Sequence, residues 1–96
     1  MKVLDSVLDA IGNTPIVRLN RLPGAQSAEV LVKLEYLNPS GSVKDRAAWG
    51  IIRDAEQKGL LGPGSVIVEA SSGNQGISLA MIGAVRGHKV VVFMPE

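Results

Sequence analysis

Residues 66–76 read VIVEASSGNQG, an apolar run followed directly by small polar residues and glycines. The run Val66 to Val68 is continuous and β-branched, which is typical of a strand covered on both faces. After it we predict a helix from about Asn74 to Arg86, and Gly87 suits the C-terminal cap of that helix. The stretch therefore predicts a strand that leads through a short polar loop into a helix.

The flanking segments continue this alternation. Val43 to Lys58 has apolar residues at helical spacing. Val30–Leu34 and Val90–Phe93 predict two further strands, and Ile16–Leu19 predicts a weaker one. The order strand, helix, strand, helix, strand favours an α/β fold with right-handed crossovers. We expect a three-layer unit with a parallel sheet, βαβαβ.

Two loops follow strands in this arrangement, Asn38–Ser42 and Ser71–Asn74. Ligands of such sheets bind beyond the carboxyl ends of the strands. The free N–H groups at a helix start, with two hydroxyls and an amide, predict an anion site in the second loop. A carboxylate and a phosphate fit equally well by these rules, and a simple Ser and Asn helix cap is the alternative.

Lys44 breaks two local rules. It lies in the first turn of a predicted helix, at the positive end of the dipole, and its helical angle falls between Val43 and Ile51 in the apolar stripe. Both effects favour the neutral amine, which is the form that attacks an aldehyde to make a Schiff base. The alternative is a lysine that extends past the stripe to water. We expect Asp45 and Arg46 to be capping and surface charges.

Composition narrows the function classes. Ten basic and nine acidic residues give a net charge of +1 with no basic stripe, so neither nucleic acid nor a membrane is an expected partner. The absence of cysteine excludes a thiolate metal site and a cysteine nucleophile, and we expect no metal. No signal peptide or membrane-length apolar run is found, so we expect a cytoplasmic protein. His88 is expected as a surface turn residue, and Met81 and Met94 as core residues.

The sequence has more apolar surface than a chain of 96 residues is expected to bury. The predicted helix 74–86 is apolar nearly all round, and Trp49 points away from the apolar stripe of the first helix. Both features indicate surface meant for something outside these 96 residues.

Three segments resemble one known family. They are Ile11–Pro15, Asn38–Arg46 and Ser71–Asn74, and the ending Phe93–Glu96 agrees with them. Together they resemble the cysteine synthase and cystathionine β-synthase group of fold-type II, tryptophan synthase β-like enzymes, which depend on pyridoxal phosphate. The resemblance covers nearly the whole chain.

The resemblance implies roles for particular residues. Lys44 would hold pyridoxal 5'-phosphate as a Schiff base and then move the substrate α-proton, and Asn74 would hydrogen-bond the ring hydroxyl oxygen of the cofactor. Ser71, Ser72, Asn74 and Gln75 would hold the substrate carboxylate. The reaction would be β-elimination of a leaving group from an activated serine, followed by addition of a thiol or sulfide. The family usually has Thr where Ser71 and Gln75 stand and Gly where Ser40 stands.

The resemblance also implies that residues 1–96 form a partial N-terminal region, a single incomplete domain of fold-type II. The phosphate-binding loop and the side chain that meets the pyridine nitrogen are not in this sequence. Two hypotheses follow. One is a β-replacement enzyme whose remaining portion lies on another chain or was not included, with a small amino-acid substrate and association as a homo-oligomer or with that remainder. The other is a non-catalytic truncated or engineered fragment that folds, as an oligomer, without activity. We do not expect the isolated chain to catalyse the reaction. A generic nucleotide-binding domain is disfavoured because no phosphate fingerprint is present.

Overall fold

The computed structural model describes all of residues 1–96. It confirms both predicted helices and all four predicted strands, with small shifts at their ends. In chain order the elements are the 3-10 helix η1 (Val7–Ala10), β1 (Ile16–Arg18), β2 (Leu31–Lys33), the 3-10 helix η2 (Glu35–Leu37), α1 (Lys44–Gln57), β3 (Val66–Ala70), α2 (Asn74–Arg86) and β4 (Lys89–Phe93).

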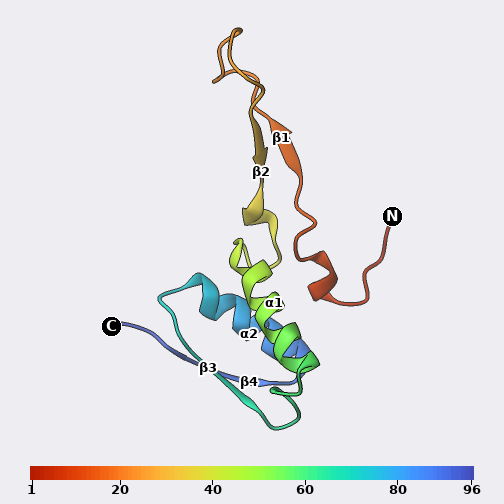
Figure 1. The fold of residues 1–96 in the computed structure, drawn as a ribbon, viewed down its shortest axis with the longest axis vertical. Coiled ribbons are helices and arrows are strands. Elements are labelled where there is room, and N and C mark those ends of the chain that lie inside the picture. Colours follow the sequence, from red (N-terminus) through yellow and green to blue (C-terminus); the bar gives the residue numbers. More distant parts are fainter.

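The strands form two separate sheets of two strands each. β3 and β4 are parallel, with Val66 opposite Lys89 and Ala70 opposite Phe93, so β3, α2 and β4 make the expected crossover unit. The strand predicted at Val30–Leu34 differs from the expectation of a single parallel sheet, because as β2 it pairs antiparallel with β1. Its burial alternates between exposed and partly buried residues, which suits a hairpin that faces water. Figure 1 shows this hairpin extending away from the two long helices.

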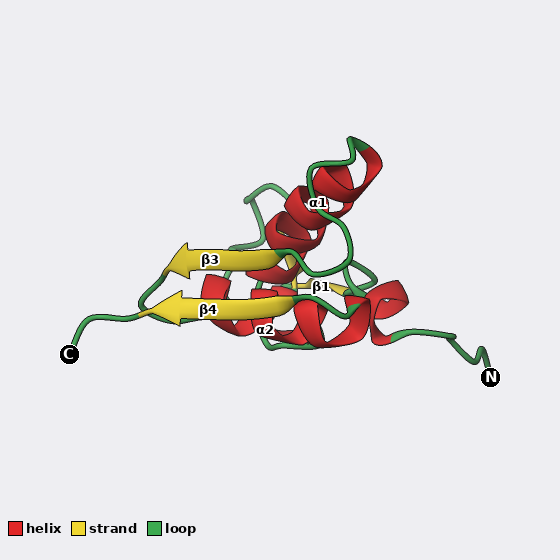
Figure 2. Ribbon diagram, turned by 90° about the horizontal axis from the view of Figure 1, so that it is seen from below, coloured by secondary structure: helices red, strands yellow, loops and turns green.

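α2 is the central element of the fold, since it packs on β3, β4, α1 and η1. Figure 2 shows it behind the parallel strands. The prediction that the strands are covered on both faces is wrong for β3. Val66 and Val68 are 50% and 61% exposed, because no other element of this chain lies on that face of the sheet.

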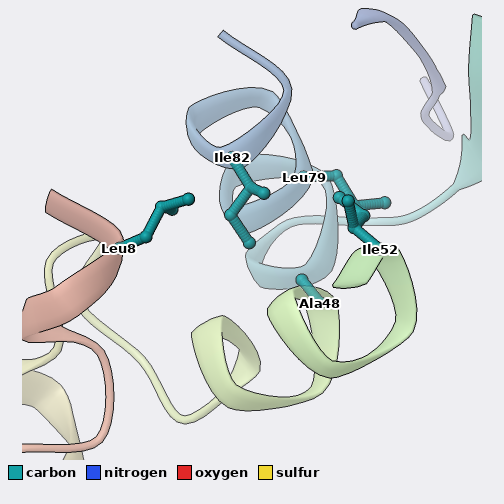
Figure 3. Packing of buried hydrophobic residues seen from close by; sticks show 5 residues of the cluster. All are labelled: Leu8, Ala48, Ile52, Leu79 and Ile82. Atoms are coloured by element: carbon teal, nitrogen blue, oxygen red, sulfur yellow. The ribbon is translucent and has the colours of Figure 1, made fainter. Parts of the chain in front are cut away.

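The hydrophobic core is small and lies between the two long helices. It consists of five buried side chains from η1, α1 and α2, drawn in Figure 3: Leu8, Ala48, Ile52, Leu79 and Ile82. Met81 packs against this cluster as expected, whereas Met94 is exposed and the prediction that it is a core residue is wrong. On α2 the apolar residues Ile77 and Val85 also remain exposed, which agrees with the apolar excess seen in the sequence.

The ends of the long helices follow local rules. Gly87 ends α2 in the left-handed conformation with a φ of 78°, as expected for a C-terminal glycine. At the start of α1 the Ser42 hydroxyl accepts the Lys44 N–H at 3.2 Å, although Val43 occupies the cap position. No helix of this structure is long and apolar enough to cross a membrane.

The side chain of His88 is largely enclosed, so the prediction that it is a surface turn residue is wrong. Its side chain is 6% exposed, and Nε2 lies 2.9 Å from Oε2 of Glu56. Arg86 also donates to Glu56, and the hydrogen bond with His88, followed by that from Arg86, holds the pKa of Glu56 below its usual value. The contact joins the C-terminal half of α1 to the turn between α2 and β4.

Candidate functional site

Lys44 is the first residue of α1, and its side chain is exposed. The predicted burial is wrong, because the neighbouring apolar residues Val43 and Ile51 are themselves at least half exposed. The Lys44 ammonium makes no ion pair and no hydrogen bond within the chain. The structure therefore presents an unpaired amine at the start of a helix.

Asp45, the next residue, is fully buried, so the prediction of a surface charge is wrong. Its Oδ2 accepts the Ser40 N–H at 2.9 Å, and its Oδ1 accepts the Ser78 hydroxyl at 2.7 Å. The Ser40 hydroxyl also donates to Oδ1 and lies 3.1 Å from the Ser78 hydroxyl. We call Ser40, Asp45 and Ser78 the Asp45 network. Every polar group in it has a partner, as burial requires.

A second network lies on the other side of the same turn. Asn38 is buried, its Oδ1 accepts the Gly12 N–H at 2.8 Å, and its Nδ2 donates to the Glu35 carbonyl at 2.9 Å. Arg46 is surface-exposed as predicted, but it is also structural. Its Nε donates to Glu35 Oε1 at 2.5 Å and its Nη2 donates to the Gly12 carbonyl at 2.9 Å. We call Gly12, Thr14, Glu35, Asn38 and Arg46 the Glu35 network.

Glu35 collects the donors of this second network. The Arg46 guanidinium, then the Thr14 hydroxyl at 2.5 Å, lower the pKa of Glu35 from 4.5 to about 2. The same hydrogen bond raises the pKa of Arg46 above its usual value. Both groups are therefore charged near neutral pH, and they hold the first and second resembling segments together. Lys44 thus lies on a turn that is fixed from two sides.

The second candidate loop connects β3 to α2. The Ser71 N–H donates to the Phe93 carbonyl at 3.0 Å, and the Ser71 hydroxyl accepts the N–H groups of Gly73 and Gly76, both at 3.1 Å. Ser71 is therefore used to shape the loop. Ser72 and Asn74 are exposed. The N–H groups of Ser72, Asn74 and Gln75 have no acceptor within the chain, so three backbone donors remain available to an anion.

Gln75 supplies a further unpaired group. Its Oε1 atom is buried and has no hydrogen-bond partner. An open groove of about 400 Å³ borders the same loop and is lined by Ser72, Gly73, Gly76, Ile77, Val92 and Met94, among others. The unused backbone donors at the start of α2 fit a ligand that carries a carboxylate. The unpaired amine of Lys44 fits a cofactor with an aldehyde.

The Asp45 network brings the two candidate segments together. Asp45 follows Lys44 in the chain, and Ser78 lies one helical turn after Asn74 on α2. Reasoning from the sequence missed Asp45 and Ser78, because an acid in a first turn and a serine in a helix carry no signal of burial. The one available signal was Ser40, which stands where the resembling family usually has Gly.

Comparison with known proteins agrees with the resemblance. A model of the family described as pyridoxal-phosphate dependent enzyme matches residues 7–96. A probable cysteine synthase of Bacillus subtilis is 57% identical over 96 residues, which cover 100% of this chain and 31% of that protein. A cystathionine beta-synthase of Apis mellifera is 53% identical over 97 residues, covering 99% of this chain and 19% of that protein.

A solved structure is also similar. It is the O-ureido-L-serine-bound form of O-ureido-L-serine synthase in which a lysine is replaced by alanine, with a TM-score of 0.88 and 53% identity. The match covers 97% of this chain and 29% of that one, so the chain spans less than a third of the length of each of these relatives. The similarity confirms the fold-type II architecture and the resemblance to cysteine synthases. The chain belongs to the family of pyridoxal-phosphate dependent enzymes.

Proposed function

We propose that this chain supplies the cofactor lysine and the substrate carboxylate site of a β-replacement enzyme of the cysteine synthase type. Such an enzyme eliminates a leaving group from an activated serine and adds a thiol or sulfide, which forms cysteine or a related amino acid. One observation carries the proposal. The unpaired amine of Lys44 precedes Asp45, and the Asp45 network ties this turn to Ser78 on α2, the helix whose start carries three unused backbone donors.

Lys44 would bind pyridoxal 5'-phosphate through its amine and would move the proton at the α-carbon of the substrate. No carboxylate pairs with it, so no ion pair has to break before the amine reacts. The two networks fix the backbone on both sides of Lys44, which limits the positions that its side chain can reach. The cofactor, when bound, supplies the electron sink.

The loop before α2 would hold the substrate. The N–H groups of Ser72, Asn74 and Gln75 would donate to its carboxylate, and the exposed Ser72 hydroxyl would add a fourth donor. Ser71 would keep these donors in place through its bonds to Gly73 and Gly76, and its own hydroxyl proton remains to be donated. Asn74 would also hydrogen-bond the ring hydroxyl oxygen of the cofactor.

Gln75 would contribute to substrate binding at the start of α2. The proposed contact of Gln75 with the substrate is through its backbone N–H, which has no acceptor within the chain. The structural neighbour was solved with O-ureido-L-serine, a serine derivative. We propose the same class for this chain, a small amino acid activated at its side chain.

We also propose a cytoplasmic location, in line with the amino-acid synthesis named for the relatives. For assembly we propose a homo-oligomer or association with a polypeptide that supplies the rest of the relatives' length. The exposed apolar residues Val66, Val68 and Phe93 on and beside one sheet face support association. The same surface favours the second candidate, a chain that folds as an oligomer without catalysing the reaction.

The test is covalent loading. The purified chain is titrated with pyridoxal phosphate and reduced with borohydride, and the modified lysine is identified by peptide mass. We expect modification at Lys44 that is lost in Lys44→Ala and kept in Lys58→Ala, a control change of an exposed lysine at the C-terminal cap of the same helix. Modification that survives Lys44→Ala at an equal level would contradict the proposal.

Turnover separates the two candidate functions. The loaded chain is given O-acetyl-L-serine and sulfide, and cysteine is measured. Formation of cysteine that depends on Lys44 would establish an active enzyme. Specific loading of Lys44 without formation of cysteine would establish a chain that binds the cofactor but does not catalyse the reaction. Addition of a polypeptide that supplies the rest of the relatives' length should then produce activity.

A further inference from the structure

The Asp45 carboxylate lies between two segments that are far apart in the sequence. Ser40 belongs to the turn that precedes Lys44, and both its N–H and its hydroxyl donate to Asp45. Ser78 belongs to α2, 33 residues beyond Asp45, and donates to Oδ1 at 2.7 Å. A single fully buried carboxylate therefore holds both segments at once.

This arrangement resists independent movement of either segment. If α2 shifts away from α1, Asp45 loses one donor and Ser78 is left without an acceptor in the interior. If the turn at Ser40 opens, Asp45 loses its other donors. Burial makes each loss costly, because water does not reach these atoms to replace the missing bond.

We propose that Asp45 is a positioning residue that couples the turn carrying Lys44 to the start of α2. Fixing one segment then reduces the opening of the other, and the coupling is reciprocal. The coupling rests on the hydrogen bonds described here. Its consequence for cofactor loading rests in addition on the proposed function of Lys44.

Amide hydrogen exchange tests the coupling without any cofactor. Ser78→Ala removes the donor on α2, and we expect exchange of the Ser40, Lys44 and Asp45 amides to rise by about tenfold, the effect of one hydrogen bond to a charged acceptor. Ser40→Ala should in return raise exchange at the Gly73 and Gly76 amides. Ser40 is only partly buried, so its replacement should disturb the fold less than replacement of the buried Ser78 while removing a donor to the same carboxylate.

Ile82→Val is the matched control, because it weakens α2 one turn further on and leaves the Asp45 network intact. It should raise exchange throughout the chain only as far as it lowers the free energy of unfolding. The coupling would be overturned if, in Ser78→Ala, exchange of the Ser40, Lys44 and Asp45 amides rose only as far as the loss of global stability explains, as it does in Ile82→Val.

Loading of Lys44 distinguishes failure of this inference from failure of the proposed function. The rate of borohydride-trapped modification should fall severalfold in Ser78→Ala and stay near the wild-type rate in Ile82→Val. An unchanged rate in Ser78→Ala, with a wild-type chain that loads, would overturn the positioning role. A wild-type chain that does not load at Lys44 would instead refute the proposed function, and the exchange data would still decide the coupling.

Discussion

Gly83 provides a direct test of how closely α2 packs on β4. A Cβ atom added there would lie 2.3 Å from Val90 Cγ2 and 3.1 Å from the His88 carbonyl oxygen, so α2 or β4 would have to move. Overpacking of this kind costs about 1–3 kcal/mol. Alanine is the better helix former by about 1 kcal/mol, which offsets part of that cost. Because one of the close atoms is backbone, we expect the upper end, a net loss of about 1–2 kcal/mol for Gly83→Ala.

Gly50 is the matched control. It also lies inside a long helix, but a Cβ there would meet no atom within 4 Å. Only the helix propensity then changes, so Gly50→Ala should stabilise the chain by about 0.5–1 kcal/mol.

The two variants are compared with the wild type by urea denaturation and by thermal unfolding, both followed by far-ultraviolet circular dichroism. The melting temperature should fall for Gly83→Ala and rise for Gly50→Ala, by about 4–8 °C for each kcal/mol in a chain of this size. A Gly83→Ala variant as stable as the wild type would show that α2 and β4 are not in contact as described. Destabilisation by both variants to the same extent would refute the reasoning from local packing.

Further predictions concern other parts of the chain. Glu35 has a pKa lowered from 4.5 to about 2, so its contribution to stability is present above pH 4.5 and is lost as the pH falls towards 2. Glu35→Gln should therefore reduce the pH dependence of the urea midpoint between pH 4.5 and 2. An unchanged pH dependence would show that the Arg46 contact contributes nothing. Ile52→Ala leaves a cavity in the core and should lower the free energy of unfolding by about 2–5 kcal/mol. Ile51→Ala, on the exposed side of the same helix, should change it by no more than about 0.5 kcal/mol. Equal losses of stability in urea denaturation would show that the core lies elsewhere. Gly12→Ala should cost about 1–2 kcal/mol, because its φ of 83° disfavours a side chain and its Cβ would lie 2.8 Å from the Arg46 guanidinium; calorimetry that shows no loss would contradict the assigned turn.

Local features were predictable from the sequence. The bounds of α2 and its cap at Gly87 followed from helical spacing and a glycine, and the apolar runs marked β3 and β4. The Ser71–Asn74 loop was recognised because polar residues follow a strand directly, whereas the 3-10 helix η2 separates the Asn38–Ser42 loop from β2. Each of these signals depends on residues within about one or two helical turns of each other, so a single stretch of chain contains all the information.

The tertiary structure alone decided which residues are buried and which strands pair. Lys44 was expected inside an apolar stripe, but Val43 and Ile51 of that stripe are themselves exposed, and so is the amine. Asp45 and His88 were expected at the surface, but Ser78 and Glu56 reach them from more than 30 residues away and make burial possible. The strand at Val30–Leu34 pairs with β1 and not with β3, although its composition permits either partner. Burial and strand pairing depend on contacts between distant parts of the chain, and local spacing carries no record of them.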